Sequence, residues 1–302
     1  MKKLKDLSFN FKKKFFFSRV KKNNLKGIIK FFNIHSGVKI HKKFYIHRYF
    51  NGKKFNSFIC YTKSKIIAHV GYVQYSIKSG KRKIYSRHSS VVDINYRNKK
   101  IYSNLLDYSF KNLKQIDSFL FWPNNNNKKK NFKKIKKKFF YKIKNNLIFF
   151  NSNKNINKNL KKLTNLKLFN QYYLLNTYDN IIYKDLTYFK KRYFGLKYNK
   201  YYYDVFEDES LAIFTENKVN KDPILIELIG NKNKKREHLK YLSKNFKFYY
   251  CVHPSKIINY KKFTKFEVTN IKFNLFYLTN KKFNLKNYDI QIADTDSFMK
   301  TI

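Results

Sequence analysis

The segment from His88 to Asn124 limits the possible folds more than any other part of this sequence. Its residue pattern predicts a strand at 86–94, a basic turn, a helix at 101–113, and a second strand at 118–122 that stops at Pro123. The helix is predicted from apolar residues that form one stripe: Ile101, Leu105, Leu106, Phe110 and Leu113. A strand–helix–strand order is typical of an α/β (α+β) protein with a mixed sheet.

The same order of elements occurs twice along the chain. Arg48-Tyr49-Phe50 matches Arg192-Tyr193-Phe194 at an offset of 192 − 48 = 144 residues. In each half a pair of predicted strands follows, and then a strand, a basic loop, a helix, a strand and a proline. In the second half these elements are 200–215, 224–229, 233–235, 236–244, 246–252 and Pro254. We therefore expect a duplicated α/β unit.

A polar stretch, 151–164, is rich in Asn and Lys and predicts the boundary between the units. We expect one domain at 1–150 and another at 165–302, each a twisted mixed β-sheet flanked by helices. The 302 residues are 43% hydrophobic and 20% aromatic, which is enough to build such cores and excludes a disordered chain. With only 7 Gly and 3 Pro, collagen-like and Pro-rich classes are excluded too.

The net charge of +50 has two interpretations. Only seven of the 68 basic residues are Arg, whereas a phosphate-reading surface usually draws on Arg as well as Lys. Lys, Asn, Ile, Phe and Tyr have A/T-rich codons, so the composition indicates drift in an A/T-rich genome, with no specific nucleic-acid partner. The alternative is a non-enzymatic RNA- or ribosome-associated protein that uses basic grooves and aromatic platforms.

Several other classes are excluded by absent patterns. No apolar run approaches the length of a membrane-spanning helix, and no secretory signal is visible. Cys60 and Cys251 lack metal-type spacing, and the seven His form no ligand pair, so we expect no metal site. Reduced cysteines are typical of a cytoplasmic protein.

The turn before the helix at 101–113 is a candidate anion site. Backbone N–H groups at a helix start are unpaired and carry partial positive charge, so they bind phosphate or diphosphate. Arg97, Lys99 and Lys100 add full charges at the same place.

The residues of this turn resemble a known family. The stretch 92–101, VDINYRNKKI, is similar to the acetyl-CoA loop of the GNAT N-acyltransferase superfamily, typically V-x-P-x-Y-R-G-K-G-I. FLFWPN resembles the following strand of a bacterial subfamily of about this length. Residues 47–51 and Asp294-Thr295-Asp296 resemble two further segments of that subfamily.

The resemblance implies two tandem GNAT-like units, the first binding acyl-CoA and the second degenerate. It implies an N-acyltransferase (acetyltransferase) with acetyl-CoA or another acyl-CoA as cosubstrate. An acceptor amine attacks the thioester carbonyl while a backbone N–H on the strand before the loop polarises it. The acceptor is expected to be an amine-bearing small molecule, such as an amino or nucleotide sugar for surface polysaccharide synthesis. A GNAT pseudoenzyme is a further alternative.

The resemblance also assigns site residues. The predicted cofactor-binding residues lie on the strand end, the loop and the strand after the helix: Val91, Val92, Arg97, Asn98, Lys99, Lys100, Ile101 and Asn124. The candidate bases are His88 and Asp93, and Tyr141 is the candidate donor to the leaving thiolate. Because successive strand residues alternate between faces, we expect at most one of His88 and Asp93 to face the crevice.

Two positions depart from the family pattern. Asn98 and Lys100 stand where the family has Gly, which takes turn conformations closed to most residues. Two outcomes are open. Either Lys100 lies in ordinary helix geometry with its ammonium on a phosphate, or the cofactor site is damaged.

Overall fold

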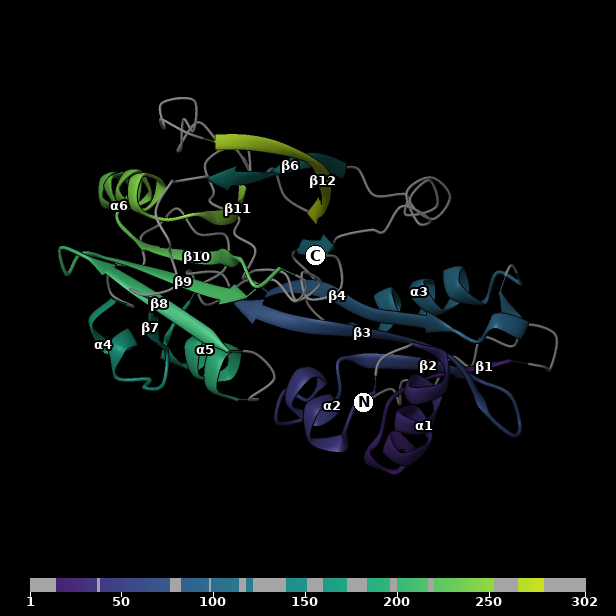
Figure 1. Ribbon diagram of the computed structural model, residues 1–302. Coiled ribbons are helices and arrows are strands. Elements are labelled where there is room, and N and C mark those ends of the chain that lie inside the picture. Colours follow the sequence, from purple (N-terminus) through teal and green to yellow (C-terminus); the bar gives the residue numbers. More distant parts are fainter. Residues whose placement is uncertain are drawn as a thin grey trace.

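A computed structural model shows a mixed sheet of twelve strands with helices on both faces (Figure 1). The strand order is β1-β2-β3-β4-β5-β12-β6-β11-β10-β9-β8-β7. The structure describes residues 15–36, 39–76, 83–97, 99–113, 118–121, 140–150, 160–172, 184–195, 200–216, 220–252 and 266–279. Within this set, only the backbone is described at 76, 83, 118–121, 140–150, 251–252 and 266–279.

The first half of the chain forms one end of the sheet. Its strands are β1 (Phe16–Arg19), β2 (Ser57–Tyr61), β3 (Ile66–Ser76), β4 (Lys83–Val92) and β5 (Ser118–Phe121). Its helices are η1 (Lys22–Asn24), α1 (Leu25–His35), α2 (Lys42–Tyr49), η2 (Ile94–Tyr96) and α3 (Ile101–Asn112). Neighbouring strands are antiparallel except β4 and β5, which run parallel because α3 crosses between them. Helices α1 and α2 lie on one side of β2–β4, and α3 lies on the other (Figure 1).

The second half forms the other end with the same alternation. Its strands are β7 (Lys161–Lys162), β8 (Tyr201–Phe206), β9 (Ser210–Glu216), β10 (Pro223–Gly230) and β11 (Phe248–Val252). Its helices are α4 (Leu168–Tyr172), α5 (Leu186–Phe189), η4 (Lys190–Phe194) and α6 (Lys232–Asn245). Here the parallel pair is β10–β11, and α6 makes the crossover. The predicted α/β class, with mixed strands flanked by helices, is confirmed.

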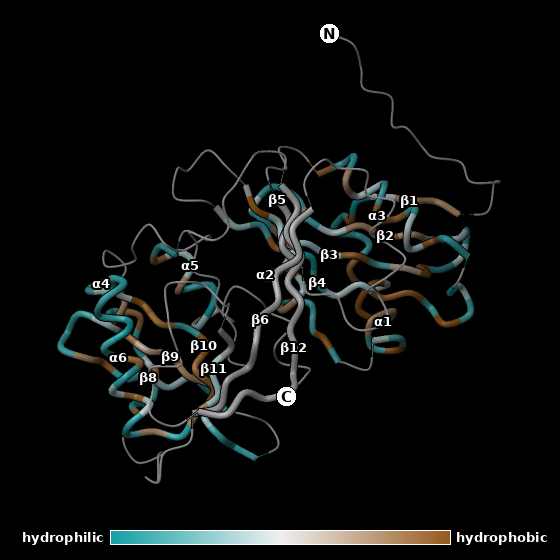
Figure 2. The backbone as a smooth tube through the Cα atoms, turned by 90° about the horizontal axis from the view of Figure 1, so that it is seen from above, coloured by the Kyte–Doolittle hydropathy of each residue, from teal (hydrophilic) through white to brown (hydrophobic). Residues whose placement is uncertain are grey.

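Two long strands in the middle of the sheet join the two ends. These are β6 (Phe140–Phe150) and β12 (Phe266–Thr279), neither of which the sequence pattern predicts. Strand β12 pairs with β5 of the first half, and β6 pairs with β11 of the second half. Figure 2 shows β6 and β12 running between the two groups of helices. Each half of the chain therefore contributes a strand beside the other half, and the sheet is continuous.

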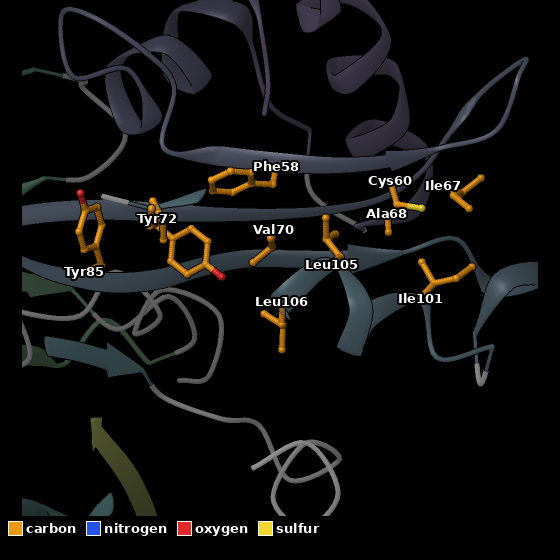
Figure 3. Close-up of a cluster of buried hydrophobic side chains, with 11 residues drawn as sticks. Phe58, Cys60, Ile67, Ala68, Val70, Tyr72, Tyr85, Ile101, Leu105 and Leu106 are labelled. Atoms are coloured by element: carbon orange, nitrogen blue, oxygen red, sulfur yellow. The ribbon is translucent and has the colours of Figure 1, made fainter. Parts of the chain in front are cut away.

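The core on the α3 side explains the position of that helix. Ile101, Leu105 and Leu106 are buried against β2–β4, where they meet residues such as Phe58 and Tyr72 (Figure 3). Figure 3 shows these α3 side chains pointing toward the strands. Burying each such side chain contributes about 1.5–3 kcal/mol. This packing fixes where α3 begins relative to the end of β4.

Candidate active site

Strand β4 carries a β-bulge near its end. In the antiparallel register with β3, Gly71 lies opposite His88 and His69 lies opposite Val91. Ser89 and Ser90 therefore have no register partner on β3, and Ser89 takes a left-handed φ of 46°. A bulge of this kind bends a strand and releases backbone groups from the ladder.

On its other edge, β4 separates from β5 just before the bulge. The parallel pairing joins Ile84 to Ser118 and ends with Ser86 opposite Leu120. Within the part of the chain that the structure describes, no strand pairs with this edge of β4 beyond Ser86. Among the described residues, the backbone of β4 from Arg87 to Val92 therefore has no strand partner on the β5 side.

The bulge overturns the expected alternation of side chains. His88 contacts Arg48 of α2, and Asp93 contacts Lys65 and lies 3.9 Å from His35 of α1. Both predicted bases therefore lie on the α1–α2 side of the sheet, not on opposite faces. The inserted residue at 89–90 shifts the period of two by one position, so simple alternation fails across it.

On the α1–α2 side of the sheet, a buried hydrogen-bond network contacts the backbone of the bulge. His69 Nδ1 lies 2.9 Å from the Ser89 carbonyl oxygen, and His69 Nε2 lies 2.7 Å from the Tyr45 hydroxyl. Tyr45 in turn hydrogen-bonds Ser57 at 2.8 Å. Burial lowers the pKa of His69 to about 4, so the ring is neutral. Since a carbonyl only accepts, Nδ1 carries the proton of the neutral ring and donates it to the Ser89 oxygen.

His88 is buried and neutral. Arg48 donates from Nη2 to His88 Nδ1 at 3.1 Å, so the ring proton is on Nε2. That Nε2 is buried and has no hydrogen-bond partner among the described residues. Burial, together with the charges of Arg48, Arg192 and Arg87, lowers the pKa of His88 well below its usual value. Arg48 and Arg192, from the two matching Arg-Tyr-Phe segments, therefore both lower the pKa of His88 by their charge, and Arg48 also hydrogen-bonds it.

Asp93 closes the end of β4. Its carboxylate accepts from the Asn95 backbone N–H at 3.0 Å and from the Lys65 ammonium at 3.1 Å. Burial alone would raise its pKa, but these two donors lower it below the usual range. Asp93 is therefore ionised, and it caps η2 at the start of the loop that leads to α3.

The basic loop lies exposed before α3. Arg97 and Lys99 are exposed, and the Lys99 and Lys65 ammonium groups lie 5.2 and 5.0 Å from the centre of the Tyr96 ring. Arg97 Nε contacts the Val92 carbonyl at 3.4 Å. Val91 packs toward α1 and α2, whereas Val92 packs toward α3. Ile101, also among the predicted cofactor residues, is buried in the α3 core. The positive side chains therefore gather beside the first turn of α3.

Lys100 does not lie in ordinary helix geometry. It is the N-cap of α3, with φ 59° and ψ 3°, a left-handed conformation that glycine adopts freely and other residues adopt at a cost. The expectation of a helical Lys100 is therefore wrong. The backbone follows the path that a glycine permits, and α3 begins at the very next residue.

Three predicted residues cannot be located as side chains. Asn98 and Asn124 lie outside the described residues, and Tyr141 is described only as backbone in β6, opposite Tyr277. Among the described residues, no group of three His, Cys, Asp or Glu side chains could hold a metal ion. None of the described helices has the length and hydropathy needed to cross a membrane.

Solved structures with the same arrangement are enzymes that transfer acyl groups. A GCN5-related N-acetyltransferase (GNAT) from Anabaena variabilis matches with a TM-score of 0.61 and 10% identity, over 88% of this chain and 73% of that one. Another from Kribbella flavida matches with a TM-score of 0.57 and 9% identity, over 87% of this chain and 70% of that one. The chain therefore has the GNAT fold. No protein family model matches the sequence, and no curated protein matches it.

The fold is also similar to that of another kind of acyltransferase. N-myristoyltransferase from Saccharomyces cerevisiae, solved with bound myristoyl-CoA, has a TM-score of 0.57 and 11% identity. The match covers 91% of this chain and 85% of that one. The likeness thus extends through both halves of the sheet and is not confined to the segment with the loop motif.

Sequence reasoning missed two groups of residues in this GNAT-fold site. Nothing in the sequence signals His69, Tyr45 and Ser57, because their importance comes from contacts across three separate elements. Arg48 and Arg192 were signalled by the repeated Arg-Tyr-Phe segment, although that repeat did not indicate that both approach His88.

Proposed function

We propose that this protein is an acyl-CoA-dependent N-acyltransferase. The observation that carries the proposal is the conformation of Lys100. A glycine-like backbone turn at this residue leads directly into α3, next to the bulged and open end of β4. A diphosphate fits the unpaired N–H groups at such a helix start, and the open edge of β4 leaves backbone groups for an extended thiol arm.

The proposed cofactor residues follow the sequence motif. Arg97, Lys99 and Lys100 would neutralise the diphosphate, and the backbone from Asn98 to Ile101 would donate to it. Val91 and Val92 would flank the pantetheine arm along β4, with Asn124 beyond the end of β5. Acetyl-CoA or a longer acyl-CoA would serve as cosubstrate.

The proposed reaction is direct transfer. The acceptor nitrogen attacks the thioester carbonyl carbon, the C–S bond breaks, and the proton that the amine loses is balanced by the one that the thiolate gains. His88 and Asp93 remain the proposed bases, and Tyr141 the proposed donor to the thiolate. Since the pKa of His88 lies well below 6.5, the ring is unprotonated at neutral pH, and as a base it would take up the proton at Nδ1 in place of the Arg48 hydrogen bond.

The second half is proposed to be a degenerate unit that binds no cofactor, at 165–302 beside an acyl-CoA-binding unit at 1–150. Between β4 and α3 the chain has a loop, 93–100, whereas between β10 and α6 it has only Asn231. The Asn231 side chain accepts from the Lys234 N–H at 2.9 Å, which caps α6. Lys234 itself pairs with Glu207, Glu209 and Glu237. No loop supports a second diphosphate site there, and Lys234 is already paired with carboxylates.

The acceptor is proposed to be an amine-bearing small molecule in the cytoplasm. The resemblance to proteins of polysaccharide gene clusters supports an amino sugar or nucleotide sugar. An isotope-labelled acetyl-CoA assay against a panel of amino sugars would identify it. Cofactor binding without turnover on every amine would indicate a pseudoenzyme instead.

Isothermal titration with CoA and acetyl-CoA tests the proposal directly. We expect one site per chain, and we expect Arg97→Ala combined with Lys99→Ala to weaken binding at least tenfold, since charge-assisted hydrogen bonds are worth about 1.5–3 kcal/mol each. The matched control is Lys26→Ala combined with Lys30→Ala, which removes two exposed charges from α1. No binding at millimolar ligand, together with RNA binding that falls steeply with salt, would favour the RNA-binding alternative.

A further inference from the structure

The bulge in β4 is the only place where a described residue of that strand between Ile84 and Val92 is exposed. That residue is Ser90, whereas its neighbours are buried or half-buried. Ser89 and Ser90 are also the two residues without a partner on β3. The regular register of the β3–β4 ladder therefore skips the peptide bond between them, and a contact from outside the ladder bears on its orientation.

The contact that determines it is the one from His69. Its Nδ1–H donates to the Ser89 carbonyl oxygen at 2.9 Å, and the ring lies on the α1–α2 side, against Phe32, Tyr45 and Tyr49. In a planar trans peptide, the C=O and the following N–H point in opposite directions. Because the Ser89 oxygen points toward His69, the Ser90 N–H points away from the α1–α2 side.

We propose that His69 is a positioning residue that turns the Ser90 N–H outward to donate to the acyl carbonyl of the cosubstrate. This inference rests on the proposed acyltransferase function and deepens it. A peptide held from behind by a buried ring would be preorganised for the oxyanion that develops during acyl transfer, so no reorientation is needed at the moment of reaction.

The remainder of the network fixes His69 itself. The Ser89 carbonyl can only accept, so the neutral ring carries its proton on Nδ1, and Nε2 lies 2.7 Å from the Tyr45 hydroxyl, which also hydrogen-bonds Ser57. His69 and Ser57 are fully buried, and so is the Tyr45 ring, so water does not compete for these bonds. Tyr45 and Ser57 therefore belong to the same positioning device, although neither approaches the open edge of β4.

The test compares two ligands that differ only in the carbonyl. Acetyl-CoA has it, and S-ethyl-CoA, a thioether, lacks it. For the wild-type protein we expect acetyl-CoA to bind about fivefold more tightly, the effect of one net hydrogen bond. In His69→Leu this preference should disappear while the affinity for S-ethyl-CoA stays within twofold. His69→Asn, whose amide N–H can reach the Ser89 oxygen, should restore part of the preference.

If His69 has a purely structural role, His69→Leu should weaken the binding of acetyl-CoA and of S-ethyl-CoA equally. That result would overturn the inference. If His69→Leu does not fold, Tyr45→Phe serves instead, because it removes the Nε2 partner and keeps the ring. Tyr72→Phe is the matched control, since it breaks a buried Tyr–Ser hydrogen bond of 2.6 Å to Ser109 in the same half. An unchanged preference in Tyr45→Phe and in His69→Asn would then overturn it. Wild-type protein that binds neither ligand overturns the proposed function, and the inference with it.

Discussion

His47 and Lys191, which are 144 positions apart in the sequence, are joined by a hydrogen bond of 3.0 Å from His47 Nε2 to the Lys191 carbonyl oxygen. The spacing equals the offset between the two Arg-Tyr-Phe segments, so corresponding positions of the two halves touch each other. His47 lies in α2 and Lys191 in η4. This bond connects a helix of one half to a helix of the other, and the Tyr75–Tyr188 ring contact adds a second link, from β3 to α5.

Gly195→Ala should weaken this connection between α2 and η4. A Cβ at this position would lie 2.1 Å from His47 Cε1 and 2.9 Å from the Lys191 oxygen. We expect a loss of about 1–3 kcal/mol in the free energy of unfolding, typical of overpacking, measured by urea denaturation. The control is Gly27→Ala in α1, where the nearest atom is an Ile66 methyl at 3.3 Å. If Gly195→Ala and the wild type are equally stable, the close packing of Gly195 against His47 is contradicted.

Mild acid should destabilise the protein through its buried histidines. His69 has a folded-state pKa of about 4 against 6.5 when unfolded, so the unfolded chain takes up the proton first. The stability is complete above pH 6.5 and is lost as the pH falls toward 4, by about 3 kcal/mol for His69 alone. Denaturant unfolding at pH 7, 6, 5 and 4 measures this loss. In His69→Asn the free energy of unfolding should fall less steeply with decreasing pH than in the wild type. Equal slopes would refute the assignment of this loss to His69.

Glu227→Gln should be strongly destabilising. Glu227 and Lys184 form a fully buried ion pair at 2.8 Å, and Tyr193 donates a hydrogen bond to the other carboxylate oxygen. Removing the carboxylate charge leaves an ammonium buried opposite a neutral amide, which costs about 3–5 kcal/mol. The double variant Lys184→Met with Glu227→Gln should recover much of this loss in thermal unfolding. A double variant less stable than Glu227→Gln would show that the pair does not account for the effect.

Lys100→Gly should stabilise the fold and keep cofactor affinity. Relief of the left-handed conformation at φ 59° is worth about 1 kcal/mol, seen as a higher Tm. Because Arg97, Lys99 and the backbone N–H groups would still bind the diphosphate, CoA affinity in titration should change less than threefold. Lys221→Gly is the control, at φ 62° and away from the loop. If CoA affinity falls more than tenfold in Lys100→Gly but not in Lys221→Gly, the Lys100 ammonium contributes most of the binding.

Elements with a strong local pattern were predicted well from the sequence. The apolar stripe of 101–113 became α3, and the strands expected at 57–77, 118–122 and 246–252 became β2, β3, β5 and β11. In α3, the side chains Ile101, Leu105, Leu106 and Leu113 of the predicted stripe are buried. The loop between β4 and α3 was recognised from its residue order, which is also a local signal.

Strands β6 and β12 were not predicted, because their stability comes from partners far away in the sequence. Residues 140–150 and 266–279 mix lysines and asparagines with aromatics without a clear period of two. They pair with each other and with strands of opposite halves, a choice that no local pattern encodes.

The site geometry was predictable only in part. A bulge depends on one residue, Ser89, taking a positive φ, and serine carries no strong preference for it. Once the bulge is missed, the faces of His88 and Asp93 are assigned incorrectly. Lys100 shows the reverse case, since a lysine in place of the family's glycine argued against a left-handed turn, and the residue takes one directly before the packed helix α3.

The position of β12 has a consequence for biosynthesis. As the chain leaves the ribosome, β5 emerges well before the segment that will lie beside it, 266–279. One flank of the nascent N-terminal portion therefore stays open until translation is nearly finished. An unprotected strand flank invites association with other chains, so slow translation or crowding should favour aggregation, and chaperones that shield such flanks should raise the yield of native protein.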